Sequence, residues 1–424
     1  MKWNSAHWQR KVTDLKKFIE PLVAELGRSE RRESAALYVQ GLLMPGQRKS
    51  IEPMAERLRV DSQKLQQFIA DSPWPDRKVW QAIRREVIPV LEPLQSWVVD
   101  ETGWLKQGGD SVGVAHQYCG AVGKQAQCQV AVELVVSDGE VAAPVGGRLY
   151  LPEAWTKDSP RRQKAGVPQS GVFQTKPQIA GELIEETLAD GVTAAPILGD
   201  SVYGNAPELR ARIRRLGLEY LFNAEEHWLA WPQRAKLTQG PKYWSVGKQA
   251  PKGQTLRAFA EGFKAGQWQT AAWQAADGEK RATRLAWKEI YLHSDLDEKT
   301  GQWPGCWLVA DWPEGQADPY HVYIGWLKQP PAKGRMLRLS RGRWPIEQYF
   351  QRGKDDLGLD HYEGRGWRGF HHHLTVSAIA YLFVVVDYLR SKKNFRPDVG
   401  TGTASDAAVA RAFARLLSLL SDGV

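Results

Sequence analysis

SWVVDETGW, residues 96–104, marks the point at which the chain changes from a helical to a mixed pattern. Its β-branched run ends in two acids, and GVAHQYCGAV, CQVAVELVVSDG and VGGRLYLP follow as further strand candidates. The helical segment KPQIAGELIEETLADG then precedes the apolar strand candidate APILGDSVYG, and PELRARIRRLG and LEYLFNA repeat this alternation. Strands followed by alternating helix and strand predict an α/β core.

The sequence before this point is predicted to be helical throughout. Apolar residues keep a 3.6-residue period from Val12 to Leu26 and stop at Gly27, and a second helix is expected from Ser29 to about Leu43.

SIEPMAERLRVDSQKLQQFIADS, residues 50–72, offers Ser50 and Asp61 as N-caps of two short helices. This length fits a helix-turn-helix that binds DNA, and a plain helical bundle with solvated basic residues fits it equally well. The basic residues concerned are Lys64, Arg57 and Arg59.

The stretch from Glu225 to Gly334 is Trp-rich and reads as a β-rich insertion. Its alternating segments TRLAWKEIYLHS, CWLVADW and YHVYIGWL are separated by Gly, Pro and Asp turns. Its tryptophans are expected in the core more often than stacked on bases; they include Trp303, Trp307, Trp312 and Trp326.

Helices are expected again in the last part of the chain. LTVSAIAYLFVVVDYL, from Leu374, is too short and too interrupted by polar residues for a membrane span, and it is predicted to be a buried helix. A basic loop, LRSKKNFRPDVGTGTA, and a helix, SDAAVARAFARLLSLLSD, are expected after it.

Composition limits the function classes. The 424 residues are 42% hydrophobic and 25% charged, as in a soluble globular protein. A net charge of +9 and a pI near 9.3 favour a polyanionic partner, nucleic acid before membrane.

Three cysteines at unrelated spacing give neither a disulfide framework nor a zinc motif. The N-terminus MKWNSAHWQRKV lacks an apolar signal core, so secretion is not expected.

Two acids stand at the ends of predicted strands. Asp100 ends VVD, and Asp200 ends PILGD with Gly204 close behind. Sites in open α/β sheets form at the carboxyl ends of strands, although an Asp there is also a common turn former or helix cap.

A third acid, Glu347, lies in RWPIEQYFQRGKDDLGL, residues 343–359. Arg343, Glu347 and Lys354 are four and seven residues apart, so one carboxylate lies between two cations on one helix face. An ordinary solvated face gives the same spacing. Three carboxylates can hold two Mg²⁺ ions for phosphoryl transfer, because hard cations prefer oxygen ligands.

Six motifs in this order resemble the bacterial insertion-sequence transposases of the DDE class. They are VVDETGWLKQG, SVGVAHQYCGAVGK, CQVAVEL, RLYLPEAW, ILGDSVYG and RWPIEQYFQRGKDDLGLDHYEGRGWRGFHHH. The similarity is greatest to the group named for insertion sequence 701, allied to the insertion sequence 4 superfamily.

The resemblance implies a ribonuclease-H-like catalytic core interrupted by a β-rich insertion, with an all-helical N-terminal domain and a helical C-terminus. The expected domains are 1–95 for DNA binding, 96–224 with 335–390 for the core, 225–334 for the insertion, and 391–424 for the basic loop and last helix.

The resemblance also assigns Asp100, Asp200 and Glu347 as catalytic metal ligands. Asp100 and Asp200 are 100 residues apart, and Asp200 and Glu347 are 147 residues apart. The β-rich insertion lies in the second, larger interval. Arg343, Glu347 and Lys354 match the Arg-x3-Glu-x6-Lys part of the allied superfamily's Tyr-Arg-Glu-Lys signature, whereas its Tyr position is Ser340 in this chain.

Other candidate residues lie beside these motifs. Glu101 is the second choice for the first ligand, because successive strand residues face opposite sides. The three consecutive histidines, 371–373, are expected at the surface or near DNA, because such a run cannot aim at one metal. The basic residues that are expected to contact DNA phosphates are Arg343, Lys354, Lys106 and Arg365, with Arg368 close by.

The resemblance implies a DNA transposase in the bacterial cytoplasm, associated with the nucleoid when bound to DNA. It would act as a homodimer on double-stranded terminal inverted repeats and target DNA, with two Mg²⁺ ions for which Mn²⁺ could substitute. Two alternatives remain open: a catalytically silent, transposase-derived DNA-binding protein, and a metal-dependent DNA nuclease without strand transfer.

Overall fold

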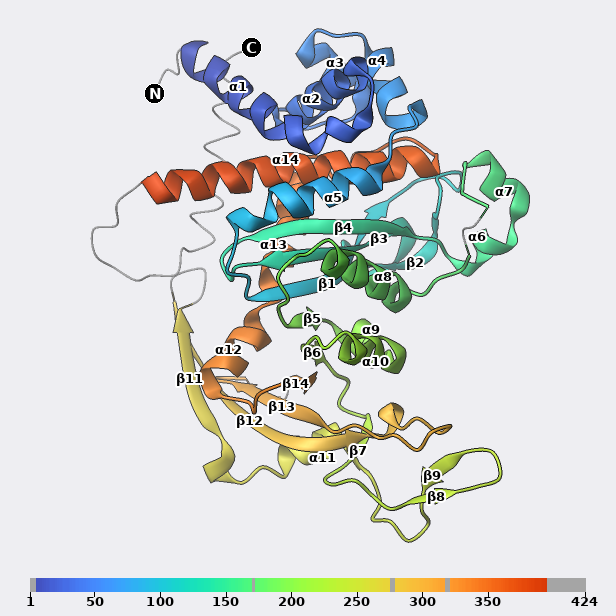
Figure 1. Ribbon diagram of the computed structural model, residues 1–424, viewed down its shortest axis with the longest axis vertical. Coiled ribbons are helices and arrows are strands. Elements are labelled where there is room, and N and C mark those ends of the chain that lie inside the picture. Colours follow the sequence, from blue (N-terminus) through green and yellow to red (C-terminus); the bar gives the residue numbers. More distant parts are fainter. Residues whose placement is uncertain (1–4, 170–171, 275–278, 317–320, 395–424) are drawn as a thin grey trace. The chain divides into compact units, whose positions relative to one another are not determined.

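The computed structural model describes residues 5–169, 172–274, 279–316 and 321–394 (Figure 1). The chain divides into two compact units. Within the described ranges, unit 1 contains residues 5–94, 100–193 and 345–394, and unit 2 contains residues 95–99 and 194–344. The predicted C-terminal helix lies outside the described residues, as does most of the basic loop before it.

The first part of unit 1 is helical, as predicted. The two short helices of the proposed helix-turn-helix begin after Ser50 and Asp61, and the Asp61 carboxylate accepts a hydrogen bond from the Gln63 N–H at 2.9 Å. Arg59 turns the chain between them with a left-handed φ of 55°. The helices are α1 (Ser5–Leu22), α2 (Ser29–Leu43), α3 (Ile51–Leu58), α4 (Ser62–Gln66) and α5 (Asp76–Glu86).

Unit 1 also contains an antiparallel sheet with helices on both faces (Figure 1). A Cβ atom at Gly146 would contact α5 and α8, whereas one at the next residue, Gly147, would lie 2.8 Å from Leu374 of α14. The elements are β2 (Ala115–Cys119), β3 (Lys124–Ser137), β4 (Ala142–Tyr150), the second half of β1 (Ser96–Leu105), α8 (Lys176–Ala189), α13 (Trp344–Asp355) and α14 (Trp367–Asn394).

Unit 2 begins with parallel pairing and continues with antiparallel strands. The first half of β1 pairs in parallel with β5, and β5 pairs in parallel with β6. Antiparallel strands β14, β13 and β12 then follow β6 in the sheet, at the three alternating segments predicted from the sequence. The elements are β5 (Ile197–Gly199), α9 (Ser201–Gly204), α10 (Pro207–Arg215), β6 (Tyr220–Asn223), β11 (Gln269–Gln274), β12 (Lys280–Leu292), β13 (Cys306–Pro313), β14 (His321–Trp326) and α12 (Lys333–Arg341).

Helix α14 is the predicted buried apolar helix, and it is longer than expected. By length and composition, residues Trp367–Lys392 could cross a membrane, but 78% of the apolar window is buried inside the protein. It packs on β4 and on α2, which identifies it as the core helix of unit 1. The helix continues to Asn394, into the stretch predicted as a basic loop.

Candidate functional site

Strand β1 carries two adjacent acids, and the structure separates them. The Glu101 carboxylate forms an ion pair with Lys176, the first residue of α8, at 2.7 Å, and both side chains are largely buried. Because neighbouring strand residues point to opposite faces, Asp100 is directed away from α8. Asp100 is half-buried, and its Oδ1 accepts the Glu101 N–H at 2.9 Å. Glu101 is therefore paired with a residue of α8, whereas Asp100 faces away from that helix.

Helix α13 presents Glu347 and is fixed to the sheet of unit 1 by two contacts. The Tyr349 hydroxyl donates to Oε2 of Glu133 in β3 at 2.7 Å, and the Lys354 ammonium donates to the Gly103 carbonyl in β1 at 3.1 Å. Glu347 itself is exposed in the first turn of the helix. Burial lowers the pKa of Lys354, and nearby carboxylates such as that of Asp360 oppose this shift.

Asp200 lies in unit 2, directly after β5. Its Oδ1 accepts the Val202 N–H at 2.9 Å, so it caps the four-residue helix α9. Gly204 ends that helix so close to β6 that a Cβ atom would lie 2.3 Å from the Asn223 carbonyl oxygen. The helix-cap role that Asp can take at a strand end is therefore realised by this half-buried side chain.

The predicted phosphate-binding residues occupy different environments. Arg343 is half-buried in unit 2, and a Cβ atom at the preceding Gly342 would lie 2.6 Å from Leu198 of β5. Lys106 is half-buried in unit 1 and donates to the Tyr362 carbonyl. Two of these basic residues are exposed: Arg365 pairs with Asp110 at 3.2 Å, and Arg368 donates to the Asp71 carbonyl at 2.8 Å.

The three predicted metal ligands are divided between the units. Asp100 and Glu347 belong to unit 1, and Asp200 belongs to unit 2. Among the described residues, no three His, Cys, Asp or Glu side chains gather as a ready-made metal-binding group.

The three consecutive histidines are not surface residues, so that prediction is wrong. They are 7%, 2% and 0% exposed and lie in α14, where burial lowers the pKa of His372 and of His373 to about 4. His372 stacks on Trp74 with ring centroids 3.5 Å apart, and its two ring nitrogens lie 2.9 Å from backbone carbonyl oxygens. His373 Nδ1 lies 3.0 Å from the Tyr38 hydroxyl. Helix packing therefore explains this cluster.

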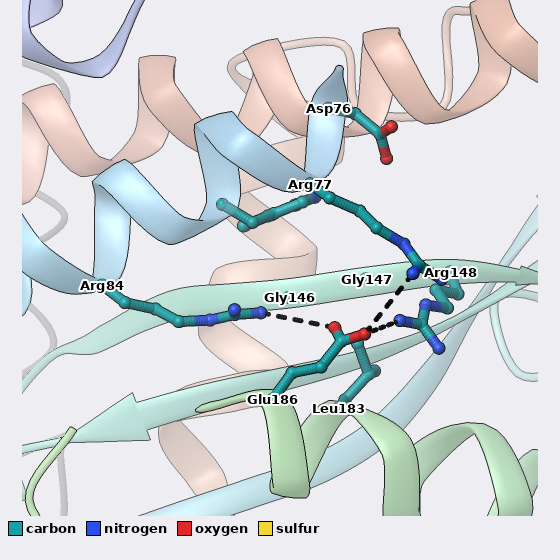
Figure 2. A pocket seen from close by; sticks show the side chains of 9 residues that line it. Asp76, Arg77, Arg84, Gly146, Gly147, Arg148, Leu183 and Glu186 are labelled. Carbon is teal, nitrogen blue, oxygen red and sulfur yellow. Dashed lines mark hydrogen bonds and ion pairs between the residues drawn. The ribbon is translucent and has the colours of Figure 1, made fainter. Parts of the chain in front are cut away.

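A separate charged pocket lies between α5, β4 and α8 of unit 1. Figure 2 shows Arg77, Arg84 and Arg148 directed at Glu186. Arg84 is buried, donates to the Val145 carbonyl at 2.8 Å and pairs with Asp190 at 2.5 Å. Because carboxylates balance the arginines, this network joins the three elements and is not an anion site.

Glu133 is a buried acid that the sequence motifs did not single out. It is the one charged residue in the apolar run QVAVELVV, and that isolation was a usable signal. Its side chain is fully buried, and Oε1 has no hydrogen-bond partner. Burial raises the pKa of Glu133 to about 8, against the opposing effects of the Tyr349 hydrogen bond and the Lys354 charge.

The raised pKa makes stability depend on pH. The folded state keeps the Glu133 proton more tightly than the unfolded state, so the free energy of unfolding falls as pH rises from about 4.5 to about 8. We expect Glu133→Gln to remove this dependence. The free energy of unfolding of the variant, relative to that of wild type, should therefore rise by about 4 kcal/mol between pH 5 and pH 8. Urea denaturation of both proteins at pH 5, 7 and 9 measures the difference. Parallel pH curves would show that Glu133 is ionised in the folded protein.

A family model and a known relative agree with the sequence motifs. A family model described as DDE superfamily endonuclease matches residues 21–292, which include Asp100 and Asp200. The chain is 30% identical over 171 residues to the probable transposase for insertion sequence element IS701 from Microchaete diplosiphon. That alignment spans 39% of this chain and 41% of the relative. Among solved structures, a cryo-EM structure of the piggyBac transposase synaptic complex with hairpin DNA matches with a TM-score of 0.43 and 9% identity, covering 97% of this chain and 78% of that chain.

Proposed function

The chain belongs to the DDE superfamily of endonucleases, and we propose that it is a DNA transposase with a ribonuclease-H-like catalytic core. In this proposal it binds the terminal inverted repeats of its insertion sequence as a homodimer, cleaves the ends and joins them to target DNA. It works in the bacterial cytoplasm, on the nucleoid when bound to DNA.

The register of two parallel strands is the observation that carries this proposal. Val98 of β1 pairs with Leu198 of β5, and the preceding pair has the same offset of 100 residues. Asp100 and Asp200 each lie two positions after the last residue that β1 and β5 pair with each other. Equal positions at the carboxyl ends of neighbouring parallel strands suit two ligands of one site.

The anchoring of α13 supports Glu347 as the third ligand. Lys354, seven residues after Glu347, lies on the same helix face. Its ammonium donates to the carbonyl of Gly103, three residues after Asp100 in β1. This bond holds the helix that carries Glu347 against the strand that carries Asp100.

The donor set fits hard divalent cations. Three carboxylates, without Cys or His, match the oxygen preference of Mg²⁺, and Mn²⁺ accepts the same ligands. When two ions are bound, they activate the attacking oxygen and stabilise the leaving oxygen. Asp100, Asp200 and Glu347 would hold them, while Glu101 remains paired with Lys176.

The basic residues orient the DNA for two displacements at phosphorus. Arg343 and Lys354 donate to phosphate oxygens beside the scissile bond. Water first attacks that phosphorus and the bond to the 3′ oxygen breaks, which leaves a 3′-OH and a 5′-phosphate. The 3′-OH then attacks a target phosphodiester, so one phosphorus–oxygen bond forms as another breaks.

Incubation with DNA that carries the element's ends tests the proposal. The full chain, end DNA, target DNA and Mg²⁺ are combined, and the products are mapped at nucleotide resolution. End cleavage followed by joined products is expected. Cleavage without joining would instead identify a nuclease, and binding without cleavage would identify a DNA-binding protein.

The α3–α4 segment is expected to contribute to end binding. Arg59 is exposed, and Lys64 is partly exposed, 3.6 Å from Glu33. Replacing both with Gln should weaken end binding by about 10-fold and reduce the slope of log K against log salt by about 2, because two phosphate contacts are lost. Titration at several salt concentrations measures both quantities. The control, Lys78→Gln, changes an exposed cation on α5; an equal effect there would favour the plain helical bundle.

A further inference from the structure

Unit 2 contains a fully buried ion pair next to α9. The side chains of Arg210, in α10, and Asp295 are both 0% exposed. Arg210 donates to Asp295 Oδ1 from Nε at 3.1 Å and from Nη2 at 2.7 Å, and Nη2 also donates to the Ser294 hydroxyl at 2.8 Å. Two nitrogens of the guanidinium are therefore fixed by one short segment, residues 294–295.

The third nitrogen of Arg210 is directed at α9. Its Nη1 donates to the Gly204 carbonyl, at the last residue of that helix. The Gly204 N–H in turn donates to the Asp200 carbonyl at 2.9 Å. A helix of four residues does not hold its shape alone, so its geometry depends on such tertiary contacts.

A second arginine, Arg214, also binds the Asp295 carboxylate. Arg214 Nη1 donates to Asp295 Oδ2 at 3.4 Å and to the Tyr220 hydroxyl, in β6, at 3.0 Å. Gly204 packs against the end of the same strand. The carboxylate therefore has one orientation, which it imposes on the Arg210 guanidinium.

A buried ion pair is weak evidence for stability, because apolar residues of similar volume often stabilise a fold as well. Apolar residues cannot donate to the Gly204 carbonyl, however. We propose that Arg210, oriented by Asp295, is a positioning residue for Asp200. It holds α9 so that the Asp200 carboxylate faces the metal ions, an inference that rests on the proposed function.

The double variant Arg210→Met/Asp295→Leu tests this role in the full chain. It removes both charges at similar volume, so neither is left buried alone. We expect amide hydrogen exchange in residues 200–206 to become at least 10-fold faster, with the β13 amides unchanged. Electron paramagnetic resonance measures the Mn²⁺ concentration that half-saturates the protein in the presence of end DNA. We expect this concentration to rise at least 10-fold and cleavage in Mg²⁺ to fall at least 30-fold.

The matched control is Arg335→Met/Glu219→Leu. That pair, 2.6 Å apart, links α12 to the residue before β6 rather than to α9. Its replacement should leave exchange in residues 200–206 and Mn²⁺ affinity at wild-type levels. An equal effect in the control would identify a general loss of stability and overturn the proposal.

Arg210→Lys covers the case in which the double variant does not fold. Lysine keeps the charge beside Asp295, but its compact ammonium cannot span both Asp295 and Gly204. Faster exchange in residues 200–206 at an unchanged melting temperature supports positioning, and wild-type exchange overturns it. If wild type cleaves no end DNA but exchange and Mn²⁺ affinity change as expected, the proposed function fails and the positioning of Asp200 stands.

Discussion

Asp100→Asn, Asp200→Asn and Glu347→Gln are each expected to reduce end cleavage by roughly 1,000-fold or more, with end binding within a few-fold of wild type. Each change removes a hard ligand charge at nearly constant shape. Single-turnover cleavage in Mg²⁺ and a binding titration on the same DNA measure the two effects.

Asn at position 200 is a specific probe because Asp200 also caps α9. The amide keeps an oxygen that accepts the Val202 N–H, so the cap remains while the ligand charge is lost. A loss of cleavage with an unchanged melting temperature then reports on the metal site.

Glu101→Gln is the matched control for the first ligand. The Glu101 carboxylate forms a largely buried pair with Lys176, so its loss should lower stability and leave most of the cleavage activity. Wild-type cleavage in Asp100→Asn together with loss in Glu101→Gln would exchange the two assignments. Retained cleavage in Asp200→Asn or Glu347→Gln would remove that residue from the site.

Local sequence patterns predicted the secondary structure of both units well. The Asp61 cap is confirmed, whereas Ser50 precedes α3 without a side-chain capping hydrogen bond. Of the four tryptophans expected in the core, Trp303 is 3% exposed, whereas Trp307, Trp312 and Trp326 are half-buried. The Asp61 cap depends on neighbours within a few residues, whereas the burial of Trp303 also depends on Trp231, 72 residues earlier.

Contacts between distant segments were not predictable in the same way. Nothing in the sequence pairs Glu133 with Tyr349, which is 216 residues away, or Arg210 with Asp295, which is 85 away. The histidine prediction failed for the same reason: His372 is buried because Trp74, nearly 300 residues earlier, stacks on its ring. Helical period identifies which residues share a face, and only the fold identifies what covers that face.

The helix that carries Glu347 gives the second large effect. If Arg343 and Lys354 lay on an ordinary solvated face, replacing either with Ala would cost less than about 1 kcal/mol and leave activity unchanged. Lys354 is instead half-buried, with its ammonium on the Gly103 carbonyl beside β1. A cation held there is available to a phosphate next to the scissile bond, and three ammonium protons allow it to keep the carbonyl contact.

We therefore expect Lys354→Ala and Arg343→Ala to cut single-turnover cleavage by roughly 10- to 100-fold, the value of one charge-assisted hydrogen bond in the reacting complex. Non-specific DNA binding should change far less, because a phosphate at the scissile bond is fixed only in the assembled site. Arg352→Ala is the control on the same helix, since Arg352 pairs with Asp356 at 3.4 Å one turn later. Arg343 directly precedes α13, which begins at Trp344. Wild-type cleavage in the Arg343 and Lys354 variants, or an equal loss in the Arg352 variant, would assign these two cations a purely structural role.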